Sequence, residues 1–241
     1  MVILKVIEIW GIRFYAYGLL IGIGVYLAWE IAKRYGRVEE KVLDKLLPGL
    51  IISGVVGARI YHIVDFWEYY AGNLKEIFYV WNGGLGIWGA LVGGTIYLSV
   101  FAYFNKLNFL KLLDSIIIGV PLGQAIGRLG NWVNGELYGK NGEPLFAWEG
   151  TLNLILFGFL LYFSGCRIRS SMTTVENKLS RRNDGLVSGI YLIGYGLIRI
   201  YLENFRSDSI IWRIGGVPAA IIFGVVGIIA GGWLIISRRR A

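Results

Sequence analysis

Long apolar runs, separated by short polar segments, dominate the hydrophobic pattern of this chain. A helix that crosses a bilayer needs roughly 20 predominantly apolar residues. Seven segments approach this length, at residues 12–32, 46–66, 84–104, 112–130, 148–165, 186–205 and 217–237. The connections between them are too short for a soluble domain. The pattern therefore predicts an all-α integral membrane protein, a single polytopic membrane domain over residues 1–241 with about seven transmembrane helices.

The composition favours the same class. Of the 241 residues, 56% are hydrophobic and 17% are charged, whereas charged residues make up about 25% of an ordinary soluble domain. The 35 Gly residues suit close packing between membrane helices, and the 9 Trp residues suit the lipid–water boundary.

Basic residues are unequally distributed between alternate connections. Of the 24 Lys and Arg residues, fifteen fall on one set of connections, six on the other set, and three inside or at the edges of the spans. The fifteen are Lys33, Arg34, Arg37, Lys41, Lys45, Lys106, Lys111, Arg167, Arg169, Lys178, Arg181, Arg182, Arg238, Arg239 and Arg240. By the positive-inside rule this set faces the cytoplasm. We therefore expect a multi-pass protein of the plasma (inner) membrane, with the N-terminus outside and the C-terminus cytoplasmic, and we attribute the net charge of +8 to topology rather than to nucleic-acid binding.

The chain has a single cysteine, Cys166, and a single histidine, His62. It can form no intrachain disulfide, and these two residues cannot build a Cys/His zinc site of the usual kind. We expect no metal and no cofactor. The first apolar stretch, from Phe14 to Ala32, is too long for the core of a cleavable signal peptide, and no A-x-A pattern follows it.

Charged residues inside the apolar segments are candidate functional residues, because an arginine at the centre of a bilayer costs about 2.5–3.5 kcal/mol on insertion scales. Arg199, Glu203 and Arg206 have the spacing i, i+4 and i+7, which places them along one helix face at the outer end of the sixth span. Two interpretations fit this stripe: a structural ion pair with Arg206 reaching to the interface, or a binding site for an anion.

A second polar constellation follows the fourth span, in residues 123–139 (GQAIGRLGNWVNGELYG). Arg128 and Asn131 are three residues apart, so both face one pocket if the segment is helical there. Asn134 and Glu136 add hydrogen-bonding groups just beyond. Polar groups at this density beside lipid have to be buried in protein or line a wet cavity. They form either a polar contact between helices or a substrate pocket.

The third feature is a glycine-rich stretch at the start of the third span. Six glycines fall within residues 83–94. Glycines at this density are typical of a surface on which two membrane helices pack closely.

The segment from Leu122 to Gly139 (LGQAIGRLGNWVNGELYG) resembles the signature of the bacterial prolipoprotein diacylglyceryl transferases. Other motifs of that family have counterparts in the same order: Tyr17-Gly18-Leu19, Gly57-Ala58-Arg59, Gly83-Gly84 through Gly94, Asp114, Pro144 to Glu149, and Tyr195 to Arg199 with Glu203 and Arg206-Ser207-Asp208. The resemblance covers nearly the whole chain, and the family has seven spans with a cytoplasmic C-terminus.

The resemblance implies an enzyme that transfers the diacylglyceryl group of phosphatidylglycerol to the thiol of the lipobox cysteine of a prolipoprotein. The product is a thioether, glycerol phosphate is released, and the reaction is the first step of lipoprotein maturation. The implied partners are phosphatidylglycerol, prolipoprotein signal peptides with a lipobox cysteine, and membrane lipids, with no nucleic acid.

Guanidinium groups offer forked donors that suit a phosphate. We therefore predict that Arg128 and Arg199 bind the lipid phosphate and stabilise the charge that develops on the leaving group. The predicted substrate pocket lies toward the outer face of the membrane. It also includes Tyr17, Asn131, Asn134, Glu136, Gly139, Glu203 and Arg206.

One position departs from the family pattern. Many members carry a histidine, often treated as catalytic, where this chain has Trp88, and an indole cannot accept a proton. His62 is the one imidazole available. It lies at i+3 from Arg59 and at about the same depth as Trp88, so His62 and Trp88 could face one cavity. Either His62 is a packed or interfacial residue, or it accepts the proton of the attacking thiol. The alternative to a histidine base is arginine-assisted thiolate formation, with the lipid phosphate as acceptor.

Functions of other classes have less support. An anion transporter or channel would also use arginines and broken, glycine-rich spans, but no inverted repeat stands out and the signature at 123–139 argues against it. A phosphotransferase or an intramembrane protease is not supported either, because the sequence has no carboxylate-rich metal motif and no Gly-x-Ser-x-Gly elbow.

Overall fold

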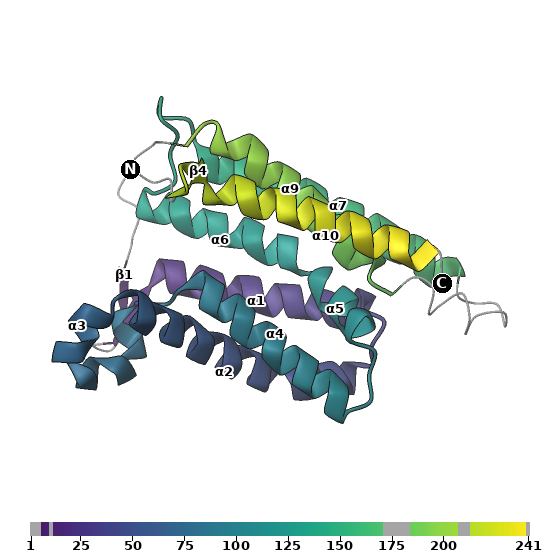
Figure 1. The fold of residues 1–241 in the computed structure, drawn as a ribbon, viewed down its shortest axis with the longest axis horizontal. Helices are drawn as coiled ribbons and strands as arrows, with labels where there is room; N and C mark the ends of the chain where they lie inside the picture. Colours follow the sequence, from purple (N-terminus) through teal and green to yellow (C-terminus); the bar gives the residue numbers. More distant parts are fainter. Residues whose placement is uncertain (1–5, 10–11, 171–183, 207–212, 240–241) are drawn as a thin grey trace. The chain divides into compact units, whose positions relative to one another are not determined.

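The computed structural model describes residues 6–9, 12–170, 184–206 and 213–239. The chain divides into two compact units, one of Met1–Arg37 and Leu113–Ala241 and the other of Val38–Leu112. Figure 1 labels their elements along the chain. The prediction of a single membrane domain stays a prediction.

The smaller unit is built on two long helices, α2 (Glu40–Asp65) and α4 (Ile87–Phe104). The connection between them contains a short helix and two 3-10 turns, which are α3 (Trp67–Gly72), η1 (Leu74–Phe78) and η2 (Val80–Asn82). A Cβ atom on Gly57 of α2 would meet the backbone of Gly89 of α4, and one on Gly93 would meet the carbonyl oxygen of Ser53. The interpretation of the glycine-rich stretch as a packing surface is thus confirmed at Gly89 and Gly93.

The larger unit begins with an antiparallel pair of strands, in which Val6 pairs with Tyr15 and Ile9 with Ile12. Its elements are β1 (Val6–Ile9), β2 (Ile12–Tyr15), α1 (Ala16–Tyr35), the second half of α5 (Phe109–Ile117), α6 (Val120–Asn134), α7 (Leu145–Ser170), α9 (Leu186–Glu203), β3 (Arg213–Ile214), β4 (Val217–Pro218) and α10 (Ala219–Arg239). Helix α6 packs on both α1 and α7, α7 packs on α9, and α9 packs on α10.

Small residues allow close approach of these helices as well. Gly189 and Gly196 of α9 face Gly231 and Gly224 of α10, and a Cβ atom added at any of the four would lie 3.0 Å or less from a backbone oxygen. Figure 1 shows the resulting side-by-side course of α9 and α10. Without a hydrophobic driving force between helices in lipid, such close packing is a main source of helix association.

The predicted spans are found, with two differences. Six helices are long and apolar enough to cross a membrane, and α5 and α6 together pass the same test although they are bent by 41° at the break between them. Span four was expected as one helix over 112–130. The chain breaks instead before α6, because Pro121 cannot donate the helical hydrogen bond to Ile117, the last residue of α5. At the break, a Cβ atom on Gly119 would collide with the backbone of Ala28 on α1. Span one begins at Ala16 rather than at residue 12, because residues 12–15 form β2.

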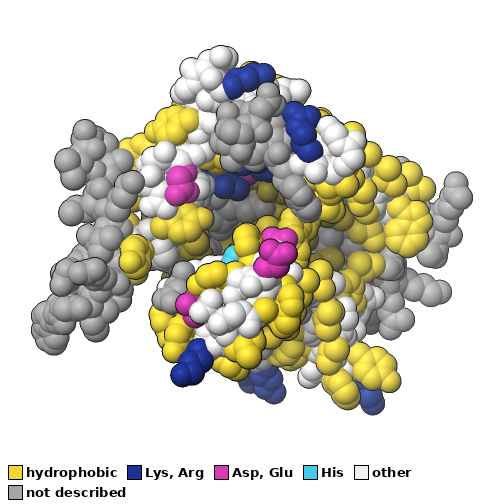
Figure 2. Space-filling view, turned by 60° about the vertical axis from the view of Figure 1, so that its left-hand side comes forward, with side chains coloured by type: hydrophobic (Ala, Val, Ile, Leu, Met, Phe, Trp, Pro, Cys, Tyr) yellow, Lys and Arg dark blue, Asp and Glu magenta, His cyan; other side chains and the backbone are white. Residues whose placement is uncertain are grey.

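Large apolar side chains cover much of the outside of the helices. Val64 on α2 is 71% exposed, and Ile229 on α10 is 66% exposed. Figure 2 shows hydrophobic side chains over much of one face, with charged side chains in small groups. Apolar surface of this extent would be unfavourable in water and suits lipid. The chain is a multi-pass membrane protein.

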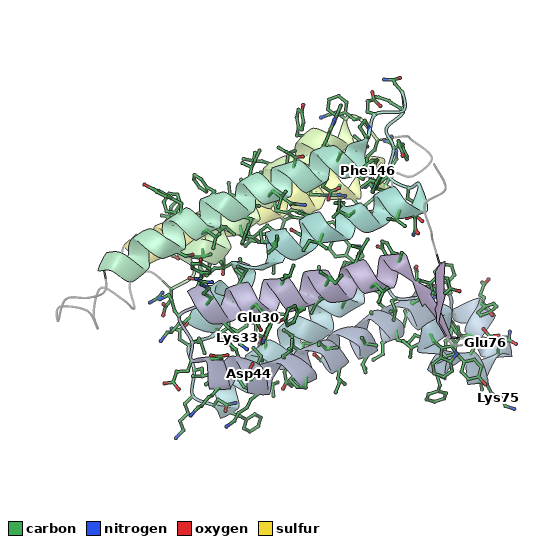
Figure 3. The ribbon with its side chains drawn as sticks, turned by 180° about the vertical axis from the view of Figure 1, so that it is seen from behind. Glu30, Lys33, Asp44, Lys75, Glu76 and Phe146 are labelled. Atoms are coloured by element: carbon green, nitrogen blue, oxygen red, sulfur yellow. The ribbon has the colours of Figure 1, made fainter. Side chains whose placement is uncertain are left out.

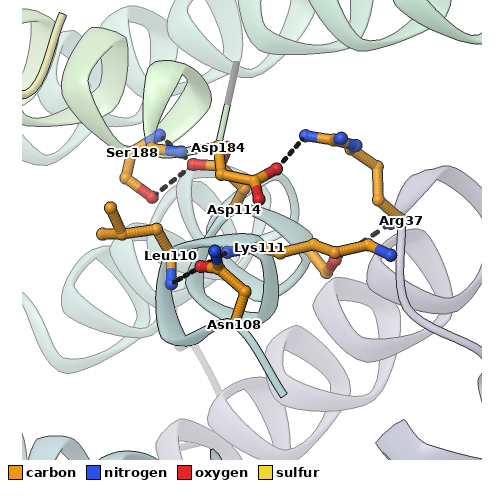
Figure 4. A network of polar contacts seen from close by, with 9 residues as sticks. Arg37, Asn108, Leu110, Lys111, Asp114, Asp184 and Ser188 are labelled. Atoms are coloured by element: carbon orange, nitrogen blue, oxygen red, sulfur yellow. Dashed lines mark hydrogen bonds and ion pairs between the residues drawn. The ribbon is translucent and has the colours of Figure 1, made fainter. Parts of the chain in front are cut away.

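Charged residues gather at the helix ends opposite the signature segment. At the end of α1, Lys33 pairs with Glu30 at 3.4 Å (Figure 3). Just beyond, Arg37 Nη1 lies 2.6 Å from Oδ1 of Asp184, which precedes α9 (Figure 4). The backbone N–H of Arg37 donates to the hydroxyl of Ser115 on α5. These contacts join three helix ends of the larger unit.

Candidate active site

Two predicted site arginines, from different helices, meet on one buried carboxylate. Arg128 lies on α6, Glu149 near the start of α7 and Arg199 near the end of α9. Arg128 Nη2 is 2.9 Å and Arg199 Nη1 is 3.6 Å from Oε1 of Glu149. The structure thus brings together residues that are 71 positions apart in the sequence and that we predicted to act on one phosphate.

The burial of this cluster makes its charges matter. The side chain of Glu149 is 3% exposed, while those of Arg128 and Arg199 are 25% and 20% exposed. A buried carboxylate is costly without a partner, and Glu149 has two. Two guanidinium groups on one carboxylate leave the cluster with an excess positive charge at the partly exposed arginines. Such a cluster can attract an anion and offer it further N–H donors.

A string of amide and carboxylate groups extends from Arg128. Its Nη1 donates to Oδ1 of Asn131 at 2.8 Å, as the i, i+3 spacing predicted. The amide of Asn131 donates to Glu136 at 3.4 Å, and the amide of Asn134 donates to the other oxygen of Glu136 at 3.2 Å. Arg128, Asn131, Asn134 and Glu136 therefore form one connected polar network rather than separate side chains.

The turn that ends α6 folds Glu136 back over the helix. Gly135 has φ +72°, a left-handed conformation that suits glycine, and the backbone N–H of Glu136 donates to the carbonyl oxygen of Asn131 at 2.8 Å. A side chain at position 135 would strain this turn and move Glu136 away from Asn131.

Gly139 and Arg206 connect the loop after α6 to the end of α9. The two residues form an antiparallel β-bridge, and the backbone N–H of Lys140 donates to the carbonyl oxygen of Phe205 at 3.0 Å. Arg206 Nη1 lies 3.7 Å from Oε2 of the buried Glu203. Burial, together with the neighbouring Arg199, lowers the pKa of Arg206. The stripe predicted on the sixth span is therefore divided: Arg206 pairs with Glu203, whereas Arg199 reaches Glu149.

Glu143 shapes the connection between α6 and α7. Its carboxylate accepts the backbone N–H of Asn141 at 3.0 Å and the amide of the same residue at 2.9 Å. Its own backbone N–H and those two donors lower the pKa of Glu143. The carboxylate therefore stays ionised at a lower pH than an ordinary glutamate. A Cβ atom on Gly139 would meet this carboxylate, which could move aside, and would also lie 2.9 Å from the carbonyl oxygen of Phe205, which could not move without shifting the backbone.

Tyr17 lies against the signature helix. A Cβ atom on Gly130 of α6 would collide with the ring of Tyr17, which stands in the first turn of α1. Gly130 therefore lets the tyrosine ring lie directly on α6, between the positions of Arg128 and Asn131 along the helix.

In the smaller unit, Arg59 holds the connection between α2 and α4. Its Nε donates to the carbonyl oxygen of Ile77 at 2.9 Å, Nη1 to that of Gly83 at 2.8 Å, and Nη2 to that of Glu76. The guanidinium carbon also lies 5.2 Å from the ring centroid of Tyr70, a cation–π distance. Arg59 is buried and organises the backbone of residues 76–84.

His62 lies one turn from Arg59 and packs among aromatic rings. Its ring centroid is 4.6 Å from that of Phe66 and 5.9 Å from that of Tyr70. A Cβ atom on Gly84, which has φ +73°, would lie 2.6 Å from Nε2 of His62. Trp88 follows in the first turn of α4 in the same unit. These contacts fit a packed histidine, and its role as a base stays a prediction.

Two residues of the larger unit were missed by sequence reasoning. Glu149 was noted only as the end of a loosely matching motif, and Asn153, one turn further along α7, was not noted. Both residues are almost completely buried, at 2% and 0% exposed when backbone and side chain are taken together. The available signal was that Glu149 is an acidic residue at the edge of an otherwise apolar span, a position where a charge needs a partner.

Comparisons with known proteins identify a single family. The sequence profile described as Prolipoprotein diacylglyceryl transferase matches residues 5–237. Curated relatives carry the name phosphatidylglycerol–prolipoprotein diacylglyceryl transferase. The relative from Streptococcus uberis is 33% identical over 95% of this chain and 92% of its own length. The relative from Finegoldia magna is 32% identical over 97% and 94%, and that from Clostridioides difficile 32% identical over 92% and 90%.

Proposed function

This chain belongs to the prolipoprotein diacylglyceryl transferase family, and we propose that it transfers the diacylglyceryl group of phosphatidylglycerol to the lipobox cysteine of prolipoproteins. The thiol sulfur forms a thioether with the terminal glyceryl carbon of the donor. Glycerol phosphate leaves, and the reaction is the first step of lipoprotein maturation.

The observation that carries this proposal is the meeting of Arg128 and Arg199 on Glu149. The donor lipid is anionic, and its phosphate gains charge as the bond from carbon to the phosphate oxygen breaks. Guanidinium donors held in place between helices stabilise such charge strongly, because water does not compete with them as it does at a surface. Glu149 holds both arginines in position and limits their mutual repulsion.

We assign the remaining site residues to holding the donor while sulfur displaces glycerol phosphate. The sulfur lone pair forms the carbon–sulfur bond, the electrons of the carbon–oxygen bond pass to the leaving phosphate, and the thiol proton goes to an acceptor. Asn131, Asn134 and Glu136 bind the glycerol head, and Tyr17 lines the pocket. Gly139, Glu203 and Arg206 shape its outer side.

The proton acceptor is either His62 or the lipid phosphate. An ordinary cysteine has a pKa of about 8.5, so only a few per cent is thiolate at neutral pH. Nearby arginines lower that pKa, which would make thiolate formation possible without a dedicated base.

The unequal distribution of basic residues supports an orientation. With fifteen Lys and Arg residues on cytoplasmic connections, the N-terminus lies outside, the C-terminus is cytoplasmic, and the Arg128 end of the helices faces outward. Phosphatidylglycerol would reach this end from the outer leaflet.

A defined assay tests the proposal. The purified full chain in proteoliposomes containing phosphatidylglycerol is mixed with a synthetic peptide that carries a lipobox cysteine, and the product is identified by mass spectrometry. We expect a peptide heavier by one diacylglyceryl group, linked through a bond that resists the alkali that cleaves its acyl esters. A peptide with serine in place of cysteine is the matched control. Absence of the thioether with well-folded protein would reject the function.

A further inference from the structure

Polar side chains continue beyond the arginine–glutamate cluster, into the interior of the larger unit. Gln124 lies one turn before Arg128 on α6, and Asn153 lies one turn after Glu149 on α7. Helix α6 ends and α7 begins at the same loop, so the two helices run in opposite directions. Gln124 and Asn153 are therefore displaced from the Arg128–Glu149 pair in the same direction, and each lies on the face that carries the charged residue.

The packing between α6 and α7 supports this arrangement. A Cβ atom on Gly150 would lie 3.5 Å from Cβ of Arg128 and 3.8 Å from the carbonyl oxygen of Ala125. The backbone of α7 thus approaches α6 closely between Glu149 and Asn153. From α9, the hydroxyl of Tyr191 accepts the amide N–H of Gln124 at 2.9 Å. Three helices contribute polar groups to this level.

Several of these groups have no hydrogen-bond partner within the part of the chain that the structure describes. These atoms are Nδ2 and Oδ1 of Asn153, Oε1 of Gln124 and Nε of Arg128. Asn153 is 0% exposed. Exchanging the two amide atoms of Gln124 would let it accept from Tyr191 but would still leave one amide atom unpartnered. The set holds two donors and two acceptors, and a buried amide without partners is strongly unfavourable.

We infer that Asn153, Gln124 and Arg128 bind ordered water between α6, α7 and α9. Water both donates and accepts two hydrogen bonds, so it matches a set of two donors and two acceptors. A water molecule that accepts the Nε–H of Arg128 fixes the guanidinium on its Nε side. The Nη atoms of Arg128 contact Glu149 and Asn131 on the other side. Asn153 is thereby a positioning residue for Arg128, and this second part rests on the proposed function.

The water site is tested by structure and by stability. A map of the full chain in lipid at about 2 Å resolution should show water within hydrogen-bond distance, about 2.7–3.2 Å, of the Asn153 amide. Asn153→Leu should lower the melting temperature by roughly 2–8 °C, because it displaces the water and leaves Oε1 of Gln124 and Nε of Arg128 without a partner. If no water is bound at Asn153, replacing its unpartnered amide with leucine should instead raise the melting temperature. A rise in melting temperature, or a map with no water there, overturns the site.

A matched control and a coupled pair sharpen the stability result. Leu160→Met changes shape at a fully buried position of the same helix and should shift the melting temperature little. Gln124→Leu combined with Asn153→Leu should cost less than the sum of the single changes, because both lose the same water. Strict additivity would show that the two residues do not share it.

The positioning role is tested by transfer kinetics. Asn153→Leu should reduce kcat roughly 10-fold or more, with a smaller change in KM, because a displaced Arg128 fails mainly as the leaving group departs. Asn153→Ser, which keeps a polar group and leaves room for another water, should restore most of the rate. Equal rates for both variants and the unaltered chain would reject positioning. If the unaltered chain itself forms no thioether, the proposed function fails, and the water site is judged by the map and the melting temperature.

Discussion

The carboxylate of Asp114, on α5, caps the first turn of α9 by accepting hydrogen bonds from Ser188. Its Oδ1 accepts the backbone N–H of Ser188 at 2.8 Å and the hydroxyl of Ser188 at 2.6 Å, and its Oδ2 accepts the backbone N–H of Gly185 at 2.8 Å (Figure 4). Asp114 is 1% exposed. The first N–H groups of a helix need acceptors and favour a negative charge, and here another helix supplies both.

Asp114→Asn should therefore destabilise the protein although the shape of the side chain is kept. An amide has one acceptor oxygen, and its NH2 group would face a backbone N–H. We expect a loss of about 2–3 kcal/mol, or roughly 4–12 °C in melting temperature, measured by tryptophan fluorescence in detergent. Ser188→Ala, which removes only the hydroxyl bond, should cost less. An unchanged melting temperature for Asp114→Asn would show that the cap is not important.

Arg128→Ala and Arg199→Ala should each abolish or severely reduce transfer while the protein still inserts and folds. Lysine at either position should restore activity only in part, since an ammonium lacks the forked donors of a guanidinium. Initial rates of thioether formation measure this. Arg34→Ala, at an exposed position on α1, and Cys166→Ser are controls that should keep full activity. Near-normal activity of Arg128→Ala would remove Arg128 from the mechanism.

Glu149→Gln should impair both stability and transfer. The change leaves two guanidinium groups beside a neutral amide, and breaking a buried ion pair by removing one partner costs about 3–5 kcal/mol. The partial exposure of both arginines reduces that cost, so we expect a clear loss of melting temperature rather than failure to fold. Glu30→Gln, in the half-exposed pair with Lys33, is the matched control and should have little effect. Full activity of Glu149→Gln would show that the arginines do not need this carboxylate.

His62 is tested by two variants that separate packing from proton transfer. If His62 accepts the thiol proton, His62→Gln should reduce the rate by at least about 100-fold and change the dependence of the rate on pH. His62→Phe keeps a ring beside Phe66 and Tyr70 but cannot accept a proton. An active His62→Phe variant with an unchanged pH profile would reject the base role and favour arginine-assisted thiolate formation.

The orientation is tested with a reporter that is active only in the cytoplasm. Fused after Arg240, it should be active, and inserted between residues 70 and 80, it should be silent. Cell fractionation and equal expression of both fusions are the controls. The reverse result would place Arg128 at the cytoplasmic face and contradict supply of phosphatidylglycerol from the outer leaflet.

Periodicity and composition predicted much of the fold because apolar length is a local property. The spans that became α2, α4, α7, α9 and α10 are recognisable from their own residues. The break between α5 and α6 was not predicted, although Pro121, which cannot donate a helical hydrogen bond to Ile117, marks it in the sequence. The close approach of Gly119 to Ala28, which is far away in the sequence, has no such local signal.

In the site, too, contacts within one helix could be predicted from the sequence, whereas contacts between helices could not. The contact of Arg128 with Asn131 follows from helical spacing and was predicted. The contact of Arg128 with Glu149 and Arg199 depends on how three helices pack, and no spacing in the sequence encodes it. For the same reason, Asn153 became visible only when its burial was known.

The carbonyl contacts of Arg59 bear on how a mutational screen of this protein would be read. An arginine in an apolar span is readily interpreted as a catalytic residue when its replacement abolishes activity. A loss of transfer on replacing Arg59 would therefore be interpreted in the same way as losses at Arg128 and Arg199. Yet all three nitrogen atoms of Arg59 hold backbone oxygens of residues 76–84. Its replacement would unravel the segment that leads into α4, so protein abundance in the membrane would fall together with activity. Only a screen that measures the amount of protein in the membrane as well as the amount of thioether product would distinguish Arg59 from Arg128 and Arg199.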